Sequence, residues 1–147
     1  MPVHTFDPAN VIVSIGGTPI SGLADGTFVM VSRDEDAFSK VSGADGEVSR
    51  AKSNNRSGSL TLTLLQTSMS NDILSAIAAL DEISNTGVVP VFVKEMGATK
   101  PLTTLFACEG WIKKMPDASY GKEIENREWV FDLATVNMFE GGNPYAS

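Results

Sequence analysis

An alternation of polar and leucine residues from Ser59 to Leu64 constrains the fold of this chain more than any other stretch. Successive side chains of a β-strand point to opposite faces, so this pattern predicts a strand with its three leucines on one face. The serine and two threonines then form the other face. We expect the leucine face to lie in an apolar core. What covers the polar face bears directly on function.

The segments around this strand predict a mainly β fold. Residues 11–15 alternate as a strand does, and Gly16-Gly17 is typical of a two-residue hairpin turn. Pro19 lacks the amide proton that a central strand needs, so the return strand is expected at a sheet edge. About seven strands are expected. One is the leucine strand, which is expected to continue to about 66, and the others are 11–15, 18–23, 27–31, 88–95, 102–113 and 123–138.

One helix is expected at about 70–85. Ser70, Asn71 and Asp72 are suited to its N-terminal cap and first turn, and Gly87 is suited to the left-handed position after its end. Apolar residues at spacings of three and four are expected to form its buried stripe. These residues are Ile73, Leu74, Ile77, Leu80 and Ile83. The expected architecture is an antiparallel β-sandwich or barrel with one packed helix.

Residues 32–58 change the character of the chain, because they are mostly polar and rich in Gly, Ser, Asp and Asn. A loop of this length is uncommon inside a compact domain unless it is functional or disordered. Two interpretations stay open from the residues alone. The segment is either a protruding hairpin that becomes ordered on a partner or a flexible surface loop.

The length of 147 residues predicts a single domain over 1–147, with 1–9 and 141–147 as flexible termini or termini that become ordered on assembly. We see no signal peptide and no apolar run long enough to cross a membrane. The net charge of −7 argues against a nucleic-acid binder, since phosphates are bound by clustered Lys and Arg.

Residues that would carry chemistry are few. The single cysteine, Cys108, is expected to be buried as a small apolar residue, and His4 is the only histidine, so neither a nucleophile–base pair nor a zinc site is expected. Glu128 and Asp132 share a strand face, but no stacking aromatics accompany them as a glycosidase would require. Trp111 and Trp129 are expected in the core. We therefore expect no enzyme, catalytic residue, metal or cofactor.

A self-assembling building block accounts for the one-sided polarity and the long loop, since copies that join their strand edges remove free edges. A soluble β-sandwich that binds a ligand or acts as an adaptor accounts for the same features. From the residues alone these two hypotheses stand about equal. A hydrolase that uses Glu128 and Asp132 is a third and weaker alternative.

The motifs DGEVSR (45–50) and NRSGSLTLTLLQTS followed by SND (55–72) favour the first hypothesis. With them, nearly the whole chain resembles the tail tube proteins of contractile-tailed bacteriophages, which are related in architecture to the tubes of type VI secretion systems and pyocins. The resemblance implies a structural protein that forms hexameric rings, and rings that stack into the inner tube of a tail. The tube of a phage-like secretion or bacteriocin particle is the alternative that the resemblance leaves open.

The resemblance also implies surfaces and partners. The loop 32–58 is expected to contact the neighbouring subunit or ring, and strand parity makes four polar residues candidates for the lumen. The loop contacts are expected at Asp34, Glu35, Asp36, Phe38, Arg50, Lys52, Asn55 and Arg56. The lumen candidates are Thr61, Thr63, Glu128 and Asp132.

The partners implied are further copies of the chain, the tail sheath, the baseplate, the tail terminator, and the tape-measure protein and DNA, which pass through the lumen without specific binding. The protein is then expected in the virion tail, after assembly in the host cytoplasm. An acidic protein lining such a conduit would repel phosphate, so DNA would slide through it.

Overall fold

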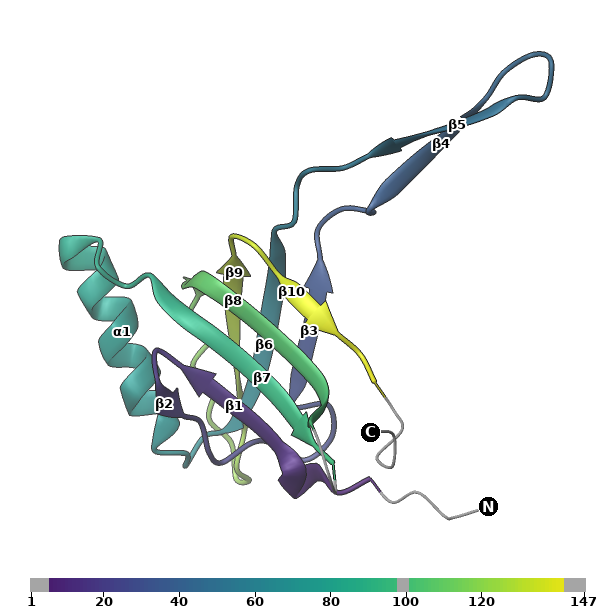
Figure 1. The fold of residues 1–147 in the computed structure, drawn as a ribbon. Coiled ribbons are helices and arrows are strands. Elements are labelled where there is room, and N and C mark those ends of the chain that lie inside the picture. Colours follow the sequence, from purple (N-terminus) through teal and green to yellow (C-terminus); the bar gives the residue numbers. More distant parts are fainter. Residues whose placement is uncertain (1–5, 98–100, 142–147) are drawn as a thin grey trace.

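The structure, a computed structural model, describes residues 6–97 and 101–141. It is mainly β with one helix, as the sequence predicts (Figure 1). The elements in chain order are the 3₁₀ turn Pro8–Asn10, β1 Val11–Ile15, β2 Thr18–Pro19, β3 Val29–Arg33, β4 Phe38–Ser42, β5 Val48–Lys52, β6 Gly58–Leu65, α1 Ser70–Ser84, β7 Val89–Met96, β8 Pro101–Lys114, β9 Asn126–Leu133 and β10 Asn137–Phe139.

Eight strands form one antiparallel sheet in the order β2-β1-β7-β8-β9-β6-β3, with β10 paired to β8. The first part of β8 pairs with β7 and β10, and its last part pairs with β9. Gly110 lies where β8 passes between them, opposite both Val89 and Leu133. A Cβ there would lie 2.8 Å from side-chain atoms of Leu133 and Val91, so only glycine fits this close approach.

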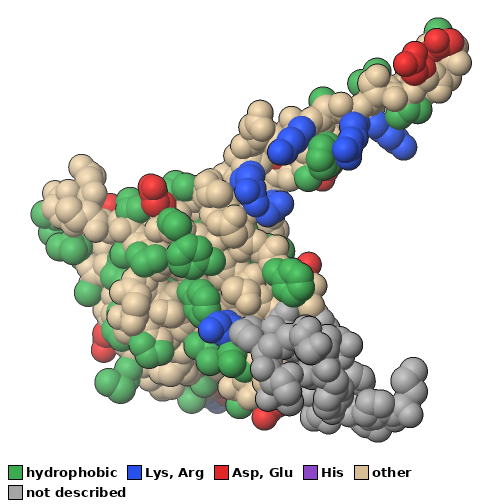
Figure 2. Space-filling model, viewed as in Figure 1, with side chains coloured by type: hydrophobic (Ala, Val, Ile, Leu, Met, Phe, Trp, Pro, Cys, Tyr) green, Lys and Arg blue, Asp and Glu red, His purple; other side chains and the backbone are tan. Residues whose placement is uncertain are grey.

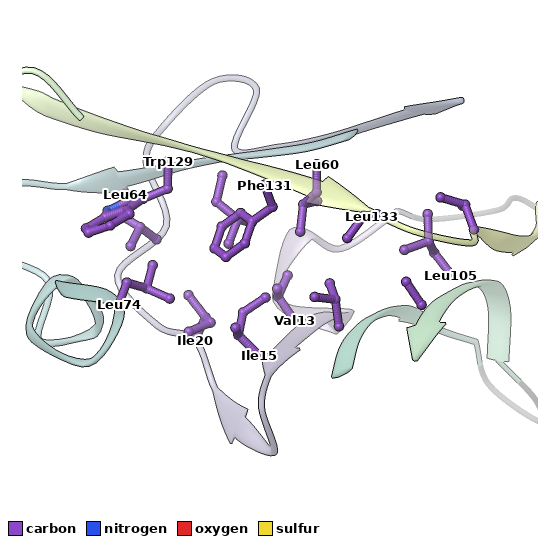
Figure 3. Close-up of a cluster of buried hydrophobic side chains, with 14 residues drawn as sticks. Val13, Ile15, Ile20, Leu60, Leu64, Leu74, Leu105, Trp129, Phe131 and Leu133 are labelled. Carbon is purple, nitrogen blue, oxygen red and sulfur yellow. The ribbon is translucent and has the colours of Figure 1, made fainter. Parts of the chain in front are cut away.

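The core lies between the β6–β9 side of the sheet and the β1–β7 side (Figure 3). The leucine strand behaves as predicted, because Leu60, Leu62 and Leu64 of β6 are fully buried. Trp129 and Phe131 of β9 pack beside them, again on the face that the alternation predicts. Trp111 of β8 was also expected in the core but is only half-buried, because it is the register partner of Asp132 on the outer face. The remaining buried members of the cluster are Val13, Ile15, Ile20, Leu74, Val91, Leu105, Ala107, Leu133 and Val136.

Helix α1 is joined to the sheet by polar side chains at its first turn, and not by the capping that the sequence predicts. Met69 occupies the cap position without a side-chain hydrogen bond. Ser70 Oγ accepts the Ser21 amide at 2.9 Å, and Asn71 Oδ1 accepts the Trp129 indole N–H at 3.0 Å. The predicted cap residues therefore hold the helix against β9 and the segment after β2.

The end of α1 corrects two further predictions. Leu80 and Ile83 were expected in the buried stripe but are exposed, Ile83 to 85%. A helix advances about 100° per residue, so Ile83, nine residues after the buried Leu74, faces the opposite side. The left-handed residue that ends the helix is Asn85 (φ 57°), and Gly87 is instead needed because a Cβ would clash with Asp81.

The described chain has ten strands, β1 to β10, whereas the sequence predicts about seven. The expected strand at 123–138 divides, since β9 ends at Leu133 and the amide of Val136 turns to donate to the carbonyl of Arg56. The return strand is only the two-residue β2, at the sheet edge that Pro19 predicts. The other added strands, β4 and β5, lie in the segment 32–58.

Candidate assembly surfaces

The segment 32–58 forms a β-hairpin that projects away from the sheet (Figure 1), and we call it the arm. Strands β4 and β5 pair with each other in their own two-stranded sheet, and every residue of both is exposed. The turn at 43–46 is closed by the Gly43 amide to the Glu47 carbonyl, at 2.7 Å, and the Gly46 amide to the Gly43 carbonyl. Of the two open interpretations, the structure therefore shows the protruding hairpin, and its ordering on a partner stays a prediction.

The two faces of the arm differ in chemistry. On one face Lys40 lies directly opposite Arg50, and Phe38 lies opposite Lys52, with the Arg50 guanidinium carbon 4.2 Å from the centre of the Phe38 ring. Like charges opposite each other on a sheet repel, so this face favours an acidic or polar partner. The other face is small and weakly apolar. It carries Ser39, Val41, Ser49 and Ala51.

Most of the predicted contact residues of the loop gather at the base of the arm. Ser57 Oγ donates to Asp34 at 2.8 Å and Ser53 Oγ donates to Glu35 at 2.9 Å, so these carboxylates hold the base of the arm together. Next to them lies an open cavity of about 300 Å³, which we call the notch. It is lined by Arg33, Glu35, Ala37, Phe38, Lys52, Ser53, Asn55 and Arg56.

The notch does not include all the predicted residues. Asp36 lines a second depression with Ser39 and Ala51, and Arg50 lies farther along β5. The sequence prediction missed Arg33, which enters the notch and donates from Nη2 to the Val136 carbonyl at 2.9 Å. It also missed Lys40, because its pairing with Arg50 depends on the hairpin register.

The four lumen candidates lie together on the face of the sheet opposite the core. Thr63 is the register partner of Glu128, and Asp132 is the partner of Ser59, two positions from Thr61. The strand parity on which they were chosen is therefore correct. Ser32 of β3 extends this polar face, its hydroxyl lying 3.3 Å from that of Ser59.

A second outer face, on β1, β7, β8 and β10, is apolar and was not predicted. Phe92 and Phe106 are register partners whose rings meet edge to face at 6.5 Å, and Phe139 is 64% exposed. Ile12 is also exposed on this side. Figure 2 shows hydrophobic side chains over this part of the molecule. Strand alternation places each of these residues on the outer face, but only the register of the strands shows that the aromatic rings lie side by side.

Cys108 corrects the expectation of a buried thiol, since it is exposed. It lies in β8 two residues after Phe106, and it lines a shallow depression with residues that include Glu109 and Asn137. Cys108 faces outward because it follows the buried Ala107 in an alternating strand, and the register shift between β7 and β8 makes Gly110, and not Glu109, the next buried residue.

Strand β3 ends the sheet, so one of its edges has no partner strand within the described chain. Such an edge presents free backbone donors and acceptors and is a template for pairing with another chain. Met30 in this strand is also exposed.

Within 6–97 and 101–141, we find no group of three His, Cys, Asp or Glu side chains placed to hold a metal ion. Over the same residues, no helix has the length and apolar character to span a membrane.

Structures of similar fold come from contractile particles. A chain of the tube-terminating cap of the anti-feeding prophage aligns with a TM-score of 0.66 and 10% identity, over 96% of this chain and 95% of that one. A chain of the PVC sheath-tube complex of an extracellular contractile injection system aligns with a TM-score of 0.58 and 15% identity, over 93% of each chain. These likenesses show the fold.

Sequence comparison reaches further than the fold. Structural protein ORF10 of Pseudomonas phage KPP10 is 27% identical over 130 residues, which cover 87% of this chain and 73% of that protein. The family described as Bacteriophage PhiTE tail tube protein matches residues 5–141, which include the arm, both outer faces and the helix. The chain therefore belongs to the Bacteriophage PhiTE tail tube protein family.

Proposed function

We propose that this chain is the structural subunit of the tube in a contractile phage tail. Six copies close into a ring, and rings stack into a hollow conduit for DNA. The role is mechanical and not catalytic. Family membership supports this proposal, and so do the unpaired edge of β3 and the apolar outer face, which suit contacts between copies.

The observation that carries the proposal is the arm. A two-stranded hairpin with no buried face is marginally stable in water, because it buries too little apolar surface to offset the entropy of ordering. Val41 and Val48 on the arm are exposed to 71% and 61%. A partner that covers the arm would supply the missing burial, and in a stacked tube that partner is another copy.

The polar outer face of β6 and β9 is assigned to the lumen. Threonine and serine hydroxyls would keep the channel wall hydrated, and Glu128 and Asp132 would repel the phosphates of passing DNA. DNA and the tape-measure protein would then occupy the lumen without specific binding. The predicted site residues of this face would thus act by hydration (Thr61 and Thr63) and by charge (Glu128 and Asp132).

The sheath would surround the tube, and the baseplate and tail terminator would close its ends. The similar chains from the PVC sheath-tube complex and from the tube-terminating cap of the anti-feeding prophage support a sheath and a terminator as partners. Such a subunit would be assembled in the host cytoplasm and found in the virion tail. The same relatives favour one alternative, in which the tube belongs to a phage-like injection particle and carries cargo other than a genome.

Deletion of the arm tests the proposal. Residues 34–55 would be replaced by a short Gly/Ser linker, which keeps Arg33 and Arg56, whose contacts with Val136 hold the base of the arm to the body. We expect the variant to fold, by circular dichroism and urea unfolding, but to form no stacked tubes by negative-stain electron microscopy. The full-length chain serves as the reference and is expected to form them.

Two outcomes would contradict the proposal. Folded deletion protein that still forms long tubes would show that the arm is not the stacking element. A full-length chain that stays monomeric at high concentration would favour a non-polymerising binding or adaptor module instead.

A further inference from the structure

We propose that the acidic tip of one arm, which is the turn that carries Asp45 and Glu47, docks into the notch at the base of the arm of a second copy. This inference rests on the proposed tube function and names the partner surfaces within it. The contact is head to tail, because tip and notch are different surfaces of the same arm. Contacts of this kind propagate from copy to copy and build rings or stacks.

The charges of the arm are separated along its length. Of 11 Lys and Arg and 18 Asp and Glu in the chain, five of each lie within 32–58, so the arm is neutral and the whole net charge of −7 lies on the rest of the protein. Figure 2 shows Lys and Arg side chains along the shaft and base of the arm and Asp and Glu side chains at its tip. The arm is thus neutral overall, with only acidic charge at its tip and with all five of its basic residues along the shaft and base, where Asp34, Glu35 and Asp36 also lie.

The tip presents its two carboxylates from a hydrogen-bonded turn. Asp45 and Glu47 flank Gly46, whose φ of 87° suits glycine, and Asp45 Oδ1 accepts the Glu47 amide at 3.2 Å. The two hydrogen bonds between Gly43, Gly46 and Glu47 close the turn. Both side chains are exposed, so their charges are available to a partner without rearrangement of the turn.

The notch carries the opposite charge. Arg33, Lys52 and Arg56 line it with a single carboxylate, that of Glu35, which already accepts the Ser53 hydroxyl. The lining of the notch therefore has an excess of two positive charges, while Asp34, which accepts the Ser57 hydroxyl, and Asp36, in the second depression, lie beside it. The volume of about 300 Å³ also suits the narrow end of a hairpin turn.

The occupant of the notch must come from another chain. The paired strands β4 and β5 run without interruption between the notch and the tip, so an arm cannot fold its tip back onto its own base. From 33 to 45 the chain advances 12 residues, which is at most roughly 40 Å at about 3.3 Å per residue. Successive copies joined in this way would therefore be displaced by no more than about 40 Å.

Charge reversal tests the pairing. The tip variant is Asp45→Lys with Glu47→Lys, and the notch variant is Lys52→Glu with Arg56→Glu. Arg33 is kept because it also holds the base of the arm to Val136. We expect each variant to raise the protein concentration needed for tube formation by about tenfold or more, since attraction becomes repulsion at every contact. The four substitutions combined in one chain are expected to restore assembly.

The matched control reverses two exposed acidic residues away from the arm, Asp117→Lys with Glu123→Lys, which changes the net charge as the tip variant does. It is expected to assemble like the unmodified chain, and urea unfolding verifies that all variants fold. Tip and notch variants that form tubes at the unmodified concentration, or a combined variant that is not rescued, would overturn the inference while the proposed function stands. An unmodified chain that forms neither rings nor tubes would overturn both.

Discussion

The sheet and the arm are built from the same antiparallel hydrogen-bond ladder but differ in what their side chains bury. Strands β6 and β9 share eight register pairs, and on one face their side chains enter an apolar core. Strands β4 and β5 share five register pairs, and all ten residues are exposed. Backbone pairing alone therefore gives a shape, whereas burial gives stability.

The two regions therefore differ in what stabilises them. We call the eight-stranded sheet together with α1 the body. The body folds on its own apolar side chains, and the arm is shaped for a surface that the single chain does not contain. A cation–π contact such as that of Arg50 on Phe38 contributes only about 0.5–1 kcal/mol at an exposed site. This contact helps to order the arm but does not replace a core.

Phenylalanine-to-alanine substitution in each region is the most direct way to break this comparison. We expect Phe131→Ala, at a fully buried position, to lower the free energy of unfolding by about 3–5 kcal/mol, because it removes a large buried ring and leaves a cavity. Phe38→Ala, at a position 46% exposed, is expected to lower it by less than about 1 kcal/mol. Urea unfolding followed by tryptophan fluorescence measures both.

The arm substitution is expected to show its main effect in assembly. Phe38→Ala is expected to weaken tube formation, because the ring lines the notch, although the monomer keeps its stability. A loss of more than about 2 kcal/mol in Phe38→Ala would show that the arm is part of the cooperative fold, and the comparison between body and arm would fail.

The sequence predicted the body well because burial there follows strand parity. The leucines of β6 and the alternate residues of β9 needed only the two-residue period to be placed inside. The Gly16-Gly17 turn was equally local, and both glycines have the positive φ that it requires. Features set by a few neighbouring residues were therefore within reach of sequence reasoning.

Features set by contacts distant in sequence were not. Leu80 and Ile83 match an amphipathic helix, but the sheet covers only the side that bears Leu74. The aromatic patch of Phe92 and Phe106 needs the register of β7 with β8, and the opposed cations of the arm need the register of β4 with β5. The single-domain prediction and the subunit contacts stay predictions until the experiments above are done.

Substitution of one asparagine in each region compares the body and the arm through a smaller expected change in the free energy of unfolding. Asn71→Leu removes the acceptor of the buried Trp129 indole and the donor to the Leu65 carbonyl, so it is expected to cost about 1–3 kcal/mol of unfolding free energy. Asn54→Leu on the exposed arm is the matched control and is expected to change it by about 0.5 kcal/mol or less. Equal effects of the two substitutions in urea unfolding would contradict the assignment of stability to the body.

Amide exchange shows the comparison without any substitution. In the unassembled chain, the amides of β6 and β9 are expected to exchange only through global unfolding, since their ladder lies against the core. Those of β4 and β5 are expected to exchange by local opening, close to the rate of an unstructured chain, because opening the arm exposes no buried side chain. Stacking covers the arm, so mass spectrometry of assembled tubes should find the arm protected and the body little changed. An arm already protected before assembly, or still unprotected in tubes, would contradict its role as the element completed by a second copy.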